Sequence, residues 1–170
     1  MVEDVLPVVK QWASVLQLQK PGDDAERDRL LCEALWIQQS FHAVDSTLLG
    51  AVLTTKTPQA RAAAVHVLTE ERERILGAFD LLKKAATDDH PRVRTEAIRG
   101  LSFYGTTESI DALLAASKQP MDYWTKYTLD AALGANEELW RQPFITGKFT
   151  KEYPAGANVM DDVQIGRAHV

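Results

Sequence analysis

The stretch Pro91-Arg-Val-Arg-Thr-Glu-Ala-Ile-Arg-Gly-Leu101 echoes Pro58-Gln-Ala-Arg-Ala-Ala-Ala-Val-His-Val-Leu68, which lies 33 residues upstream. Four positions are identical in the two copies: Pro58/Pro91, Arg61/Arg94, Ala64/Ala97 and Leu68/Leu101. Self-similarity at a period of roughly 20–50 residues is typical of solenoids, in which each unit buries its apolar face on a neighbour. The sequence therefore predicts an all-α solenoid, a fold that offers a binding surface.

Apolar periodicity and turn residues extend the repeat in both directions. We expect a helical-repeat domain over residues 1–140, with units at about 25–56, 57–89, 90–120 and 121–140. Each unit should contain two helices joined by a tight turn.

Two of the expected helices depend on particular apolar residues. The second helix of the 57–89 unit is predicted over about 71–86, with Ile75, Leu76, Phe79 and Leu82 on its buried side. The third copy of the first helix is predicted to start at Asp122, with Trp124 in the position of Val93, 31 residues earlier.

The repeated residues are predicted to form the seam, meaning the contact between the first and the second helix of a unit. The expected seam residues are Ala64, Leu68, Arg61, Arg94, Ala97, Ile98, Leu101 and Trp124. The alanines allow close approach of two helices, and the larger aliphatic side chains fill the contact.

Arg61 and Arg94 are the charged members of the predicted seam. Each is expected to pair with an acid or a carbonyl of an adjacent turn, and Asp88 and Asp89 are the candidate partners. The alternative is that both arginines lie along a solvated edge.

An aromatic group at Tyr123, Trp124 and Tyr127 has two interpretations. Tyr123 and Tyr127 lie one helical turn apart, so they can share an exposed face that docks a protein or a neighbouring domain. The alternative is that the aromatic group packs on the preceding unit, as the seam position of Trp124 suggests.

Composition and motifs point away from several function classes. The net charge is −5 and the arginines are dispersed, which argues against nucleic-acid binding. The single cysteine, Cys32, cannot form an intrachain disulfide and is expected to be a buried thiol. No stretch approaches the ~20 apolar residues of a membrane span.

Chemical motifs are equally sparse. No glycine-rich phosphate loop, metalloprotease motif or serine-hydrolase motif occurs. His42 and Asp45 could together bind a metal ion. The alternative is that His42 is a solvated histidine in a turn. We expect no catalytic, cofactor-binding or metal-binding residue.

The repeat period ends near Trp140. Residues 141–163 are expected to form an irregular arm or linker. Residues 164–170 end in Ile165-Gly-Arg-Ala-His-Val170, which matches one translation of a widely used sequencing-library adapter. We interpret this tail as an artefact and the chain as a piece of a longer protein.

The run Asp88-Asp-His-Pro-Arg-Val-Arg-Thr-Glu-Ala-Ile-Arg-Gly-Leu101 resembles a HEAT repeat. It contains the whole pattern Asp-x-x-Pro-x-Val-Arg-x-x-Ala-(aliphatic)-x-x-Leu, and the Pro58 copy contains most of it. The resemblance covers about residues 25–135. It implies a right-handed αα-superhelix of about four helical pairs, and it does not by itself imply an activity.

A narrower resemblance rests on three stretches of the chain. They are Glu33-Ala-Leu-Trp-Ile-Gln-Gln-Ser40 followed by Val44-Asp45, then Pro58–Val65, and then His90-Pro-Arg-Val-Arg94 with Pro120-Met-Asp-Tyr-Trp-Thr-Lys-Tyr-Thr-Leu129. These stretches are similar to the HEAT segment of bacterial PVC-type haem-binding-domain proteins, also described as putative membrane-bound dehydrogenases. Members of that family join a β-propeller, a HEAT segment and a c-type cytochrome domain, and are usually exported. The resemblance implies an exported or periplasmic parent with haem c in another domain. This chain has no Cys-x-x-Cys-His, so it cannot itself attach haem c.

The predicted function is therefore a non-catalytic helical scaffold, a spacer and protein-docking segment of a larger exported c-type cytochrome or dehydrogenase. The first alternative is a stand-alone HEAT adaptor that binds a protein partner. The second is a HEAT-like lyase subunit. The expected partners are proteins or neighbouring domains of the same polypeptide.

Overall fold

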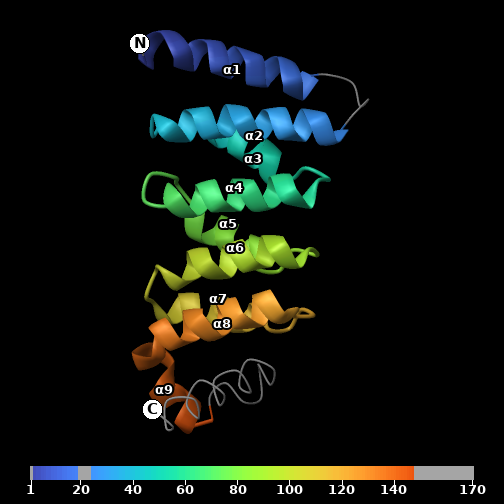
Figure 1. Cartoon of the computed structure of the whole chain (residues 1–170). Helices are drawn as coiled ribbons and strands as arrows, with labels where there is room; N and C mark the ends of the chain where they lie inside the picture. The colour runs from blue at the N-terminus through green and yellow to red at the C-terminus, as the bar shows by residue number, and fades with distance from the viewer. Residues whose placement is uncertain (1, 19–23, 148–170) are drawn as a thin grey trace. The chain divides into compact units, whose positions relative to one another are not determined.

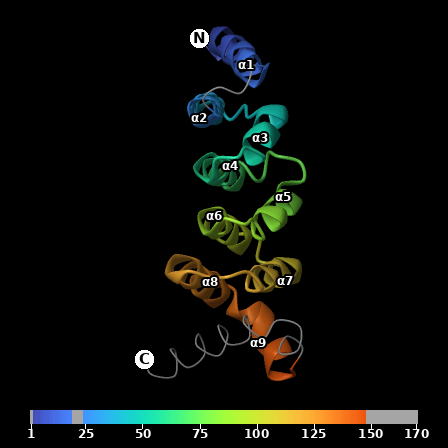
Figure 2. The same ribbon diagram turned by 90° about the vertical axis from the view of Figure 1, so that its right-hand side faces the viewer.

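The computed structural model describes residues 2–18 and 24–147, and their regular secondary structure is entirely helical (Figures 1 and 2). In chain order the helices of this part are α1 (Val2–Leu18), α2 (Asp24–Ser40), α3 (Ser46–Leu53), α4 (Pro58–Glu70), α5 (Ala78–Ala85), α6 (Pro91–Ser102), α7 (Thr107–Ala116), α8 (Tyr123–Ala135) and α9 (Glu137–Ile145). The predicted all-α fold class is confirmed. The adapter-like tail 164–170 and most of the predicted arm 141–163 lie outside the described residues.

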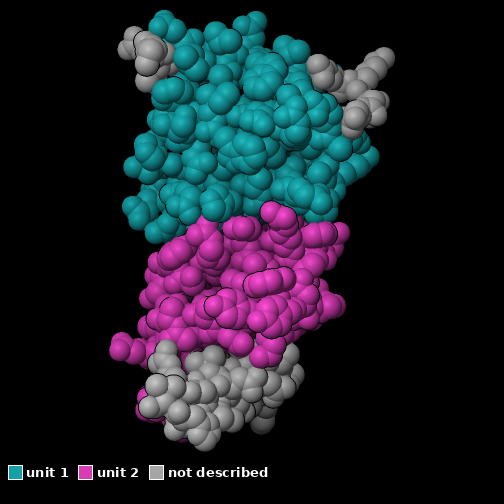
Figure 3. Space-filling model, in the orientation of Figure 1, with its two compact units in different colours: residues 1–78 teal, residues 79–170 magenta. Residues whose placement is uncertain are grey.

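The chain divides into two compact units, Met1–Ala78 and Phe79–Val170 (Figure 3). The first unit contains α1 to α4, and the second contains α6 to α9 together with nearly all of α5. The predicted 57–89 pair is thus shared between the units.

In the first unit, α2 is the central helix. It packs against α1, α3 and α4, and α3 also packs against α4. The proline at the start of α4 occupies the first helical turn, where its missing N–H costs no hydrogen bond. Asp45 caps α3 by accepting hydrogen bonds from the N–H groups of Thr47 and Leu48. The fully buried core of this unit includes Leu35, Leu49, Val52, Ala64, Val65 and Leu68.

In the second unit, α6 and α8 form the largest contact, and α7 packs against α6, α8 and α9. Thr106 and Ser109 form a reciprocal capping box at the start of α7. The fully buried side chains of this unit include Ala97, Ile98, Leu101, Ile110, Leu113, Leu129, Leu133 and Trp140.

Helix α9 extends beyond the end predicted for the last unit. The period was expected to end near Trp140, yet α9 runs to Ile145 with Pro143 inside it. Trp140 explains the difference, because it is fully buried and donates a hydrogen bond from its indole Nε1 to the Leu133 carbonyl at 2.8 Å. Its ring also meets Phe144 edge-to-face, with centroids 5.8 Å apart. The residues from 141 to 145 are therefore part of the last helical pair.

The prediction of a helix over residues 71–86 was wrong for residues 71–77. Helix α4 continues to Glu70 and α5 begins only at Ala78, so residues 71–77 form turns. Glu71 ends α4 as its C-cap, and Gly77 has a φ of 75°, which is outside the helical region and is readily adopted only by glycine. Leu76, expected on the buried side, is fully exposed, whereas Leu82 is fully buried.

These two leucines provide a test of the fold. We expect Leu82→Ala to lower the free energy of unfolding by about 2–5 kcal/mol, because it removes a buried side chain and leaves a cavity. Leu76→Ala should change it by less than about 0.5 kcal/mol, because the side chain has no buried contacts to lose. Urea unfolding of the two variants measures both values. Equal losses would support the helix predicted from sequence instead.

Candidate docking surface

Among the described residues of the second unit, the most exposed aromatic group lies at the start of α8. Tyr123, Trp124 and Tyr127 are 73%, 67% and 59% exposed, and we refer to them as the aromatic cluster. Tyr123 meets Trp124 edge-to-face, with centroids 5.1 Å apart. It stacks with Tyr127 at 6.5 Å, with the two ring planes 16° apart. The three rings therefore form one continuous apolar surface with defined geometry.

The helix cap at Asp122 fixes which side of α8 carries the cluster. Its carboxylate accepts a hydrogen bond from the backbone N–H of Thr125 at 2.7 Å. This bond is the main cause that holds the pKa of Asp122 below its ordinary value. Thr125 itself is buried, and its hydroxyl lies 3.1 Å from that of Thr95 on α6. Because Thr125 faces α6, its neighbours Tyr123, Trp124 and Tyr127 are directed outward.

The prediction that Trp124 occupies a seam position was wrong. Helices α6 and α8 begin at Pro91 and Tyr123, so the two copies are offset by 32 residues rather than 31. At this offset Val93 corresponds to the buried Thr125, and the exposed Arg92 corresponds to Trp124. The sequence comparison placed the most apolar residue in the core position, whereas the N-caps His90 and Asp122 determine the register.

The other predicted seam residues lie in the interior. Ala64, Leu68, Ala97, Ile98 and Leu101 are fully buried, and they have no accessible surface with which to contact a ligand. These residues recur in the sequence because they pack in the interior of each helical pair.

Arg61 and Arg94 bind the turn that precedes their own helices, as one of the two interpretations predicted. Arg94 donates from Nη1 to the carbonyls of Asp88 and Asp89, at 2.7 and 3.0 Å. Arg61 donates in the same way to the carbonyls of Thr55 and Lys56, at 3.0 and 3.3 Å. In both cases the acceptors lie six and five residues before the arginine. Arg94 thus contacts the backbone carbonyls of Asp88 and Asp89. We call this arrangement, which Arg61 shares, the arginine clamp.

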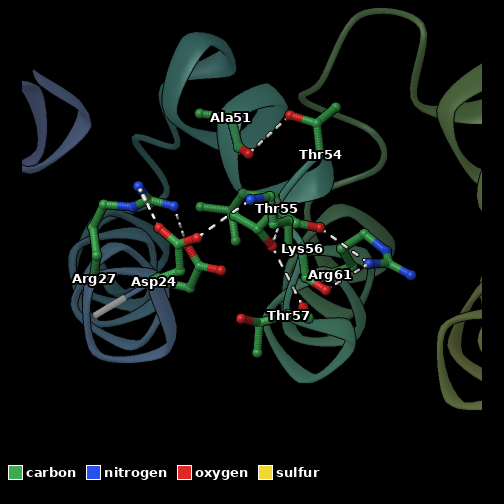
Figure 4. Close-up of polar contacts among 10 residues, drawn as sticks. Asp24, Arg27, Ala51, Thr54, Thr55, Lys56, Thr57 and Arg61 are labelled. Atoms are coloured by element: carbon green, nitrogen blue, oxygen red, sulfur yellow. Dashed lines mark hydrogen bonds and ion pairs between the residues drawn. The ribbon is translucent and has the colours of Figure 1, made fainter. Parts of the chain in front are cut away.

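The two clamps have different surroundings. At the first, Lys56 forms an ion pair with Asp24 of α2 at 3.5 Å, and Asp24 also pairs with Arg27 at 3.1 Å (Figure 4). The turn before α4 is thereby fastened to α2 as well as to Arg61 (Figure 4). At the second, Arg94 is 97% buried and also donates from Nη2 to the carbonyl of Pro120, in the turn that precedes α8.

Truncation of the Arg94 side chain should therefore destabilise the fold. We expect Arg94→Ala to lower the free energy of unfolding by at least about 1.5–3 kcal/mol, because it removes three hydrogen bonds that a charged, buried guanidinium group donates. Arg94→Lys should not restore the loss, because an ammonium group cannot reproduce the planar, forked donor geometry. The exposed Arg92→Ala is the matched control on the same helix, with an expected change below about 0.5 kcal/mol. Urea titrations that gave equal values for Arg92→Ala and Arg94→Ala would refute the clamp.

His42 is paired with Glu71 rather than with Asp45. Its Nδ1 lies 2.7 Å from a carboxylate oxygen of Glu71, and Arg74 approaches the second oxygen at 3.4 Å. Among residues 2–18 and 24–147, no group of three or more His, Cys, Asp or Glu side chains is arranged to hold a metal ion. His42 and Glu71 border a hollow of about 400 Å³ together with Trp36, Gln39, Ser40 and Glu70.

Cys32 is buried in α2, and its sulfur lies 4.0 Å from the carbonyl oxygen of Ala60. Burial raises the pKa of its thiol to about 11, and the negative charges of Asp28 and Glu33 add to the effect. The thiol is therefore protonated at neutral pH, which makes it a poor nucleophile.

Within the described part of the chain, no helix is both long enough and apolar enough to cross a bilayer.

Comparison with known proteins identifies the family to which the repeat belongs. A family model described as HEAT repeats matches residues 46–134, which is more than half of the chain. No curated protein matches the sequence. The matched region spans α3 to α8 and includes both arginine clamps. The chain therefore belongs to the family of proteins built from HEAT repeats.

Proposed function

We propose that this chain is a non-catalytic scaffold segment that docks a protein through the aromatic cluster Tyr123, Trp124 and Tyr127. HEAT repeats usually serve as helical scaffolds for protein interaction. The observation that carries the proposal is the exposure of three mutually packed aromatic rings on one helix. Tyrosine and tryptophan are the residues most enriched at the energetic centres of protein interfaces.

The composition of the cluster favours a protein over a charged polymer. Its three rings are apolar with polar tips, and the charged residues nearest on α8, Lys126 and Asp130, pair with each other at 3.3 Å. A surface of this kind suits the partly apolar core of an interface between proteins. Nucleic-acid binding would need clustered basic residues, which the chain does not have.

The partner that we propose is a neighbouring domain of a larger exported protein of the PVC-type haem-binding class. The Pro120–Leu129 stretch, which carries the resemblance to that class, also contains the whole aromatic cluster. A spacer segment requires rigid helical pairs with a surface directed at an adjoining domain, and the cluster supplies such a surface. The haem and any redox activity would belong to other domains.

The gene provides the first test. If the chain is a segment of such a parent, the reading frame should continue upstream into a β-propeller and downstream into a domain with a Cys-x-x-Cys-His motif. Sequencing of the source locus measures this directly. A start codon and a stop codon at the two ends of the present frame would contradict the parent and favour the stand-alone adaptor.

The cluster provides the second test. We expect the variant Tyr123→Ala/Trp124→Ala/Tyr127→Ala to bind a purified neighbouring domain from the same frame at least about tenfold more weakly, because it removes the aromatic anchors. Isothermal titration calorimetry measures the affinities. The variant should remain folded because the three rings are exposed.

The matched control for this variant is Thr107→Ala/Asp111→Ala on α7, which changes exposed residues elsewhere in the same unit. Unaltered affinity in the aromatic variant would show that the cluster is not the docking surface.

A further inference from the structure

Helix α1 is apolar on two sides, and only one of them is covered. Val9, Ala13 and Leu16 are buried where α1 packs against α2. A second row consists of Val5, Val8, Trp12 and Val15, which we call the outer stripe. Val8 and Val15 are 65% and 52% exposed, and Val5 and Trp12 are partly exposed.

The spacing of the outer stripe is that of a helix–helix contact. Its members follow one another at intervals of three, four and three residues, which is the a/d pattern of paired helices. This pattern is symmetric about Lys10. In an antiparallel pair of α1 helices, Val8 would face Trp12 of the second copy, and Val5 would face Val15. A small residue would then lie opposite a large one at both central positions, as interdigitating side chains require.

The charges of α1 are compatible with such a pair. Lys10 lies on another side of the helix, where its Nζ is 3.8 Å from Asp45 and where it lines a hollow of about 390 Å³ with Ala13 and Ser14. The polar residue beside the centre of the stripe is the uncharged Gln11, which can hydrogen-bond to its own copy. Asp4 flanks one end of the stripe, so an antiparallel arrangement separates the two Asp4 carboxylates, whereas a parallel one would place them together.

We propose that the outer stripe is a self-association surface, and that two copies of this chain pair through antiparallel α1 helices. The contact is isologous, because each copy contributes the same four residues. One pair of 17-residue helices is a small interface compared with the roughly 1,200–2,000 Å² of stable complexes. The association is therefore reversible and depends on concentration. It uses a surface of the first unit and is independent of the aromatic cluster.

Sedimentation equilibrium of the full chain over a wide concentration range tests the proposal. We expect the wild-type chain to shift reversibly from monomer to dimer, and Val8→Glu/Val15→Glu to weaken the dimer at least about tenfold, because it buries charges in the contact. Leu76→Glu is the matched control, since it adds a charge at a fully exposed leucine of the same unit. Circular dichroism of each variant shows whether its helices are retained.

Two outcomes of this experiment would overturn the proposal. One is a chain that is monomeric at all concentrations, which would show that the outer stripe does not bind a second copy of this chain. The other is a dimer that resists Val8→Glu/Val15→Glu but is lost in Tyr123→Ala/Trp124→Ala/Tyr127→Ala.

Cysteine crosslinking tests the orientation. Gln11→Cys should give a covalent dimer under mild oxidation, because the two copies of residue 11 lie near the symmetry axis, and Cys32 is buried and contributes little background. Asp4→Cys and Ser14→Cys should crosslink poorly, because they lie at the end of the stripe and on another side of α1. Efficient crosslinking through Asp4→Cys would overturn the antiparallel arrangement.

Discussion

The arginine clamp is the interaction on which the first two copies of the repeat, at α4 and α6, depend. A tight turn between helices leaves backbone carbonyls without partners in a helix, and a buried guanidinium group such as that of Arg94 needs acceptors. Arg94 satisfies two such carbonyls before its own helix and a third, that of Pro120, before the next one. A single side chain thereby links the turn before α6 to the turn before α8. This explains why arginine recurs with proline at a constant separation: proline begins the helix, and arginine three positions later returns to the turn that precedes it.

Burial of a guanidinium group is acceptable here because of where the helices begin. The side chain extends back past the first turn of α6 and finds carbonyl acceptors at Asp88 and Asp89. The third copy does without a clamp, because Lys126 occupies the corresponding position and pairs with Asp130 at 3.3 Å. There the cap at Asp122 and the buried threonine pair Thr95–Thr125 fix the helix instead. The repeat thus tolerates different ways of securing a turn, provided that the backbone groups are satisfied.

Much of the fold follows from the sequence, and the errors have physical causes. The start of α6 could be predicted because a proline and the apolar periodicity of Pro91–Leu101 agree there. The first half of the predicted 71–86 helix failed because Leu76 fits an apolar pattern while Gly77 requires a left-handed backbone. Trp124 was misplaced because hydrophobicity alone cannot distinguish a core residue from an exposed aromatic one. The burial of Trp140 depends on contacts within its own helical pair that no local pattern encodes. The tyrosines of the cluster could be identified from their spacing, but their ring geometry with Trp124 could not.

The turns from Glu71 to Gly77 give the chain a natural site for insertion. Side chains in this segment include one that is fully exposed, and its glycine needs no partner across the fold. An added loop between Leu76 and Gly77 would interrupt no helix and would leave the buried Glu71 and its contacts in place. Evolution or an engineer could therefore lengthen the protein here, by a recognition loop or an affinity tag, without disturbing the helical pairs on either side.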